Sequence, residues 1–202
     1  AFKPQVKVIA EILRGFIIAP EIMSQRGLFS EYQFASTEAY LPFVGIVLCS
    51  GYMWKHKKNW ITILLLICFL LMLFPITNSL FFALNTAYYS RWFYMMILIM
   101  ALASAKALDE KIKLEYGYLA TTIIFSGLIT VMLYLSLKGN QVVFHINYFL
   151  VNVLITLFGL VGLYIIYKLK DKKKLFVPLI ITGIVISTTL NGIHFFYKYN
   201  VL

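Results

Sequence analysis

Long apolar runs separated by short clusters of lysine constrain this sequence more than any other feature. Charged residues make up 13% of the 202 positions, about half the share in a typical soluble domain, and they gather between the runs. Segments that dissolve in hydrocarbon have this pattern. Runs of this length can satisfy their backbone hydrogen bonds in lipid only as helices. The sequence therefore predicts an all-α integral membrane protein.

Six apolar runs are candidates for transmembrane helices. They are Ala39–Trp54, Trp60–Phe74, Trp92–Ala105, Tyr116–Leu137, Val142–Tyr167 and Leu175–Tyr197. A span needs about 20 apolar residues. The last three runs are long enough, whereas the first three can span a bilayer only if flanking residues extend the helix. Pro75 is expected to stop or kink the second run. Trp54, Trp60 and Trp92 stand at run ends, as interface anchors do. We expect about six transmembrane helices.

The placement of lysine predicts the orientation. Loops 55–58, 106–115 and 168–174 hold three, three and five basic residues, whereas the short segments on the opposite side hold only Arg91, Lys138 and Lys198. The positive-inside rule places these three loops in the cytoplasm and the 75–91 segment outside. The net charge of +10 is explained in this way, and no basic stripe typical of a nucleic-acid-binding protein is present.

Residues 1–38 differ from the rest and are treated as an outward-facing segment before a helical bundle over 39–202. Within Pro4–Ile17, apolar side chains fall on one helical face and charged ones on another. Such a helix either lies on the outer membrane surface or packs on neighbouring protein, and the sequence fits both. Because the chain starts with Ala1, we expect it to be a piece of a longer protein.

Common catalytic and metal-binding motifs are missing from the sequence. There is no GxSxG, HExxH, Walker loop or GxGxxG. His56, His145 and His194 are scattered, and Cys49 and Cys68 lie inside apolar runs without metal-ligand spacing. No cofactor is predicted, and a divalent metal would need ligands outside this chain.

Glu38 is the candidate for acid–base chemistry on the outer side. Both aspartates of the chain fall in the predicted cytoplasmic loops, so an outward carboxylate must come from a glutamate. Glu38 stands at the mouth of the first run, close to Tyr40. The alternative is a solvated residue at the membrane interface.

The segment 74–92 is too apolar for a free loop and too polar for a simple span. Pro75 leaves backbone groups without a partner, and such a segment is tolerated at membrane depth only where protein or a wet cavity surrounds it. Arg91 and Trp92 end it. An arginine fork beside aromatic rings suits a lipid phosphate or a diphosphate. The alternative is a snorkelling arginine with Trp92 as an interface anchor.

This segment carries a family resemblance. FPITNSLFFALNTAYYSRW, followed by an apolar run, resembles the signature of YfhO-type bacterial membrane proteins. In that family a helix ends in proline, an asparagine-containing outward loop follows, and an Arg-Trp pair opens the next helix. Pro75, Asn85, Arg91 and Trp92 match this order. The upstream EYQFASTEAYLPFVGIVL is similar to the family's segment that enters a glycine-containing helix. The resemblance covers roughly residues 10–110.

The resemblance implies a GT-C-like fold of which this chain forms a part, in the bacterial plasma membrane. It also implies transfer of a sugar from an undecaprenyl-phosphate-linked donor to a cell-wall polymer, such as lipoteichoic acid, on the outer face. The residues implied are Arg91 and Trp92 for the lipid phosphate, Asn78, Asn85 and Tyr88 for a sugar pocket, and Glu38 as base.

The alternative function is a transporter or a lipid-handling scaffold without catalysis. Polar residues such as Asn147, Asn152 and Asn191 inside the last two runs favour a transport path or bonds between helices. No Asp, Glu, Lys or Arg lies within a run, which argues against ion-coupled transport. Expected partners are membrane lipid, a polyprenyl-phosphate sugar donor and further transmembrane segments or subunits, but no nucleic acid.

Overall fold

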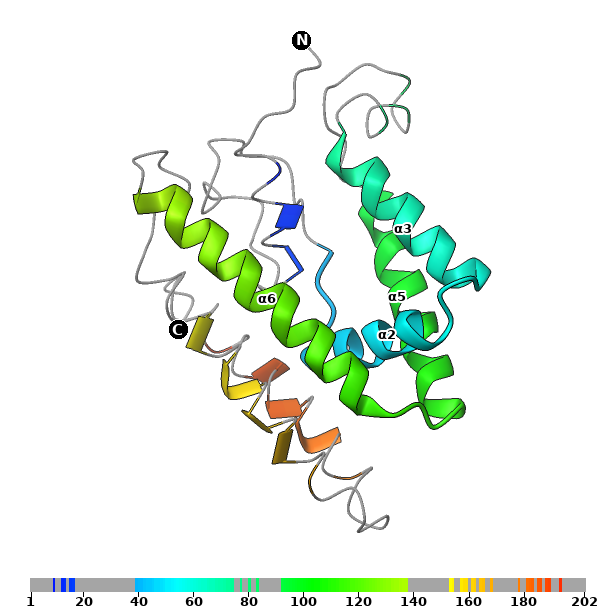
Figure 1. The fold of residues 1–202 in the computed structure, drawn as a ribbon, viewed down its shortest axis with the longest axis vertical. Helices are drawn as coiled ribbons and strands as arrows, with labels where there is room; N and C mark the ends of the chain where they lie inside the picture. The colour runs from blue at the N-terminus through cyan, green and yellow to red at the C-terminus, as the bar shows by residue number, and fades with distance from the viewer. Residues whose placement is uncertain are drawn as a thin grey trace.

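The computed structural model describes one helical bundle. Residues 39–74 and 92–137 are described throughout, together with residues 9, 12–13, 15–16, 77, 80 and 83 and part of 153–193. Four helices are bounded: α2 (Phe43–Lys55), α3 (Trp60–Leu73), α5 (Phe93–Asp109) and α6 (Leu114–Leu137) (Figure 1). Regular structure in the described part of the chain is helical, without a strand, as the hydropathy pattern predicts.

The ends of α2 and α3 follow local sequence signals. Pro42 stands at the N-cap of α2, where its missing N–H costs no helical hydrogen bond. Asn59 caps α3, since its side-chain oxygen accepts a hydrogen bond from the Ile61 N–H at 3.0 Å. Helix α3 ends at Leu73, with Phe74 as its C-cap and proline next in the sequence.

Helix α5 ends in a Schellman turn built without glycine. The Ile112 N–H donates to the Ala107 carbonyl at 3.0 Å, and the Lys111 N–H donates to the Leu108 carbonyl at 3.1 Å. Lys111 has a φ of 48°, the left-handed conformation that glycine usually supplies at this position. The turn ends the helix at Asp109, four residues beyond the predicted Ala105.

Helix α2 is the centre of the bundle. It packs against both α5 and α6, and α5 also contacts α3. Eight of its thirteen residues are buried, including large side chains such as Phe43 and Tyr52.

Hydroxyl groups on α5 and α6 form hydrogen bonds to α2. Ser104 of α5 has its Oγ 2.7 Å from the Gly45 carbonyl, and Thr121 of α6 donates to Ser50 at 3.3 Å.

Helices α2 and α6 approach each other at two glycines. A Cβ atom on Gly117 would overlap the Val47 carbonyl oxygen and would lie 2.9 Å from the Gly51 nitrogen. Backbone lies directly against backbone here, which only a residue without a side chain permits. On Gly51 a Cβ atom would make ordinary contacts, the nearest at 3.6 Å from the Gly117 Cα.

The described part of the N-terminal segment packs on this core. Ile9, Ile12 and Leu13 are helical, and Ile12 is completely buried. Phe16 lies against Phe69 of α3, with ring centroids 5.9 Å apart. Of the two settings expected for the amphipathic helix, these contacts favour packing on protein. Most of residues 1–38 lie outside the described residues, so the outward placement and the boundary at residue 38 stay predictions.

The outer surface of the bundle is apolar. Large exposed side chains line α3, α5 and α6, among them Leu66, Leu70, Leu98, Leu119 and Ile123. A helix that is apolar on its outer as well as its inner face is typical of a hydrocarbon environment. An aqueous surface would rarely expose so continuous an apolar area. The fold is therefore that of a membrane protein.

The structure does not confirm six separate membrane crossings. Within the described ranges, only α6 is long and apolar enough to cross a membrane alone, through Leu114–Val131, of which 17% is buried. Helices α2 and α3 qualify as a pair, but they are bent by 116° at the short break between them. By length and composition the pair fits one broken span or a re-entrant loop, and the two separate spans that the sequence predicts are not confirmed. The described helices support at most two membrane spans.

The last two predicted spans are described only in part. The residues described between 153 and 168 and between 178 and 193 are helical. Tyr164 lies against Tyr118 of α6, with ring centroids 6.0 Å apart, and a Cβ atom on Gly159 would touch the Phe43 ring at 3.4 Å. The fifth run therefore packs along α6 and reaches the start of α2.

Candidate functional site at the two ends of the bundle

Most of the residues predicted for the lipid-phosphate and sugar site lie outside the described residues. These are Glu38, Asn78, Asn85, Tyr88 and Arg91. Their roles stay predictions. Trp92, the next residue in the sequence after Arg91, is described and lies at the end of the bundle where α5 begins.

Trp92 is part of the packed interior. It is the N-cap residue of α5, is 4% exposed and meets the Phe93 ring edge to face at a centroid distance of 5.1 Å. Trp54 and Trp60 are 49% and 60% exposed. The expectation that Trp92 is an interface anchor like those two is therefore wrong. Its ring instead fixes the start of α5 against the core.

The N-terminus of α5 has no negatively charged side chain in its first turn. No side-chain hydrogen bond caps it. A helix of 17 residues has the positive end of its dipole there. Together these features favour a negatively charged group near Trp92.

Thr77 replaces a hydrogen bond that Pro75 cannot make. In an uninterrupted helix the Leu71 carbonyl would accept from the N–H of residue 75, which proline lacks. The Thr77 hydroxyl lies 3.2 Å from that oxygen and 3.0 Å from the Phe74 carbonyl. The sequence analysis missed this role, although a hydroxyl two residues after a helix-ending proline is a usable signal. The rest of the 75–91 segment lies largely outside the described residues.

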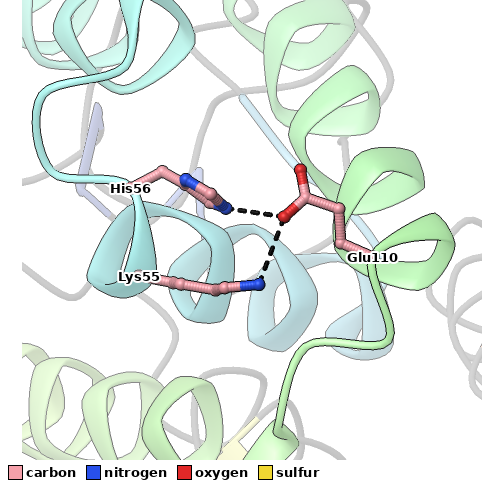
Figure 2. Close-up of polar contacts among 3 residues, drawn as sticks. All are labelled: Lys55, His56 and Glu110. Atoms are coloured by element: carbon pink, nitrogen blue, oxygen red, sulfur yellow. Dashed lines mark hydrogen bonds and ion pairs between the residues drawn. The ribbon is translucent and has the colours of Figure 1, made fainter.

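The opposite end of the bundle holds a charged cluster (Figure 2). Glu110 Oε2 lies 2.6 Å from His56 Nε2 and 3.3 Å from Lys55 Nζ. The pKa of the Glu110 carboxyl is lowered, first because His56 hydrogen-bonds to it; desolvation opposes the shift and Lys55 adds to it. The charged carboxylate therefore joins the end of α2 to the end of α5.

These contacts bring the basic loops together. The cluster links loop 55–58 to loop 106–115 directly. Lys168, at the start of the third basic loop, has its Nζ 5.2 Å from the Tyr164 ring centroid, and Tyr164 packs on Tyr118 in the second turn region of α6. The sequence predicts that the three loops share one side, and the described contacts agree. The sequence did not predict that Glu110 would connect them.

A family comparison decides the identity of the chain. Residues 28–200 match the family model described as "Bacterial membrane protein YfhO". The chain belongs to the YfhO family. The match extends far beyond residue 110, where the recognisable motifs end, and so includes the later apolar runs. Searches among curated proteins and among solved structures each found no match.

Membership in the YfhO family agrees with the apolar surface of the bundle and with a bacterial membrane location. Within the described residues no group of three or more His, Cys, Asp or Glu side chains could hold a metal ion. Cys49 and Cys68 are both buried free thiols.

The orientation of this YfhO-family bundle is open to a direct test. We expect Lys172→Cys to be protected from a membrane-impermeant maleimide in intact cells, and Gly139→Cys to be labelled, because the basic loops should face the cytoplasm. Both variants need a background in which Cys49 and Cys68 are replaced by alanine. Permeabilised cells should label both positions. Labelling of position 172 in intact cells would reverse the orientation.

Proposed function

We propose that this YfhO-family chain is the membrane core of a glycosyltransferase-like protein that binds a polyprenyl-phosphate-linked sugar at its outer face. In this proposal Arg91 holds the lipid phosphate beside Trp92. Asn78, Asn85 and Tyr88 line the sugar pocket. Glu38 acts as the general base that prepares the acceptor hydroxyl on a cell-wall polymer.

The observation that carries the proposal is the environment of the N-terminus of α5. Trp92 is buried at this helix start, and the first turn contains neither a cap nor an acidic side chain. Arg91 directly precedes Trp92 in the sequence. A guanidinium next to the positive end of a helix dipole is a strong combination for binding phosphate. The apolar outer face of the neighbouring helices suits a long isoprenoid chain.

Turnover of a lipid-linked donor tests this function. The native full-length protein would be reconstituted in vesicles with a radiolabelled undecaprenyl-phosphate-linked sugar, and loss of label from the lipid would be followed by chromatography. We expect Glu38→Gln to slow the loss by about 10²-fold or more, because general base catalysis typically contributes that much.

The matched control is Glu110→Gln. It makes the same chemical change at the opposite end of α5, so transfer should continue at the wild-type rate. If the wild-type protein binds the donor but never consumes it, the chain is a lipid-handling scaffold. If Glu38→Gln and wild type transfer at equal rates, Glu38 has no catalytic role.

A further inference from the structure

Two exposed aromatic rings form a ledge at the basic end of the bundle. Trp54 in the last turn of α2 stacks on Tyr116 in the first turn of α6, with centroids 6.1 Å apart and an interplanar angle of 9°. The two side chains are 49% and 50% exposed. Trp and Tyr rings with one apolar side and one polar tip are suited to the headgroup level of a bilayer.

A lysine lies on this ledge. Lys57 Nζ is 4.9 Å from the Trp54 ring centroid, within range of a cation–π contact. An ammonium group has three N–H donors. Contact with one ring face does not use all three, so the remaining donors can reach an anion. Lys58 follows with an exposed side chain. Glu110, the carboxylate that contacts this loop, is already bonded to Lys55 and His56.

The start of α3 adds to the positive potential. The helix begins at Trp60, two residues after Lys58, and its first turn has no acidic residue. Its dipole therefore favours negative charge beside Lys57 and Lys58. Trp60 itself is 60% exposed and marks the same level of the membrane.

We propose that Trp54, Tyr116 and Lys57, assisted by Lys58, bind the headgroup of an anionic phospholipid at this end of the bundle. The lysines hold the phosphate, and the aromatic ledge supports the glycerol region. The site is separate from the one proposed at Trp92, because the 17 residues of α5 lie between the two ends, about 25 Å. It does not depend on the transferase function.

Native mass spectrometry of the full-length protein, with phosphatidylglycerol or phosphatidylcholine added in detergent, tests the proposal. The wild-type protein should retain phosphatidylglycerol in preference to phosphatidylcholine. Each lysine that holds the headgroup directly should contribute about fivefold in affinity, so Lys57→Gln with Lys58→Gln should weaken retention by about thirtyfold. Lys57→Arg with Lys58→Arg should keep it. Excess inorganic phosphate should not displace the lipid.

The matched control is Lys106→Gln with Lys113→Gln, which removes the same charge from exposed positions at the same end. It should weaken retention at most a few-fold. Trp54→Leu tests the ledge with all lysines intact and should cost about two- to fivefold. Equal retention of both lipids by wild type, equal losses in the two double variants, or displacement by inorganic phosphate would overturn the proposal.

Discussion

Gly117→Ala should destabilise the bundle by about 2–3 kcal/mol, although alanine is the better helix former. The added methyl group would overlap the Val47 carbonyl oxygen, and the Gly51 backbone lies close behind it. Backbone atoms of a central helix cannot move aside as a flexible side chain can, so α2 and α6 must separate. For a chain of this length the loss corresponds to a drop in melting temperature of about 5–10 °C.

Two other glycines provide matched controls in the same thermal-unfolding measurement. A methyl group on Gly127, also in α6, would meet no atom within 4 Å, so Gly127→Ala should raise stability by up to about 1 kcal/mol. Gly51→Ala should be tolerated, since its nearest new contact is 3.6 Å. If Gly117→Ala and Gly127→Ala melt at the same temperature, the close crossing of α2 and α6 is wrong.

The positions of the helices could be predicted because their signals are local. Apolar runs located α2, α3, α5 and α6, and Pro75 bounded α3 to within a few residues. The end of α5 was placed too early. Its Schellman turn uses Lys111 in the left-handed conformation, so the glycine that usually marks such an end is absent.

The path of the chain could not be predicted in the same way. Nothing in residues 56–59 distinguishes a loop between two full spans from a sharp bend within one, and the 116° angle depends on how α2 packs between α5 and α6. Likewise, Gly51 and Gly117 come from distant parts of the sequence. Amphipathicity in the N-terminal segment also fits lipid and protein surfaces equally well. Burial of Ile12 and the contact of Phe16 with Phe69 separate the two settings.

The proposed site was predictable in part. The sequence identified the Arg-Trp pair, but it treated Trp92 as a choice between a ligand contact and an interface anchor. Because Trp92 is buried, it is not an interface anchor. Its ring packs in the core at the start of α5. The charged cluster at the other end was missed, because His56 and Glu110 are 54 residues apart and neither belongs to a motif.

Arg91→Ala should weaken binding of polyprenyl phosphate by roughly ten- to a hundredfold. A charge-assisted hydrogen bond contributes about 1.5–3 kcal/mol. Arg91→Lys should recover only part of the affinity, since lysine keeps the charge but loses the planar pair of donors. The amount of protein in the membrane should barely change.

A snorkelling arginine would behave differently. Lysine would then serve as well as arginine, and lipid-phosphate binding would not depend on either. Lys138→Ala provides a control at another predicted outward position, because it removes one positive charge outside the 75–92 segment. Its binding of polyprenyl phosphate should match that of wild type within a factor of about two.

The most direct measurement is therefore the affinity of the purified full-length protein for undecaprenyl phosphate, compared among wild type, Arg91→Lys, Arg91→Ala and Lys138→Ala. A lipid-phosphate site at the start of α5 predicts affinities that fall in the order wild type, lysine variant, alanine variant, with Lys138→Ala equal to wild type. Equal affinities for all four proteins would contradict it and remove Arg91 from the site.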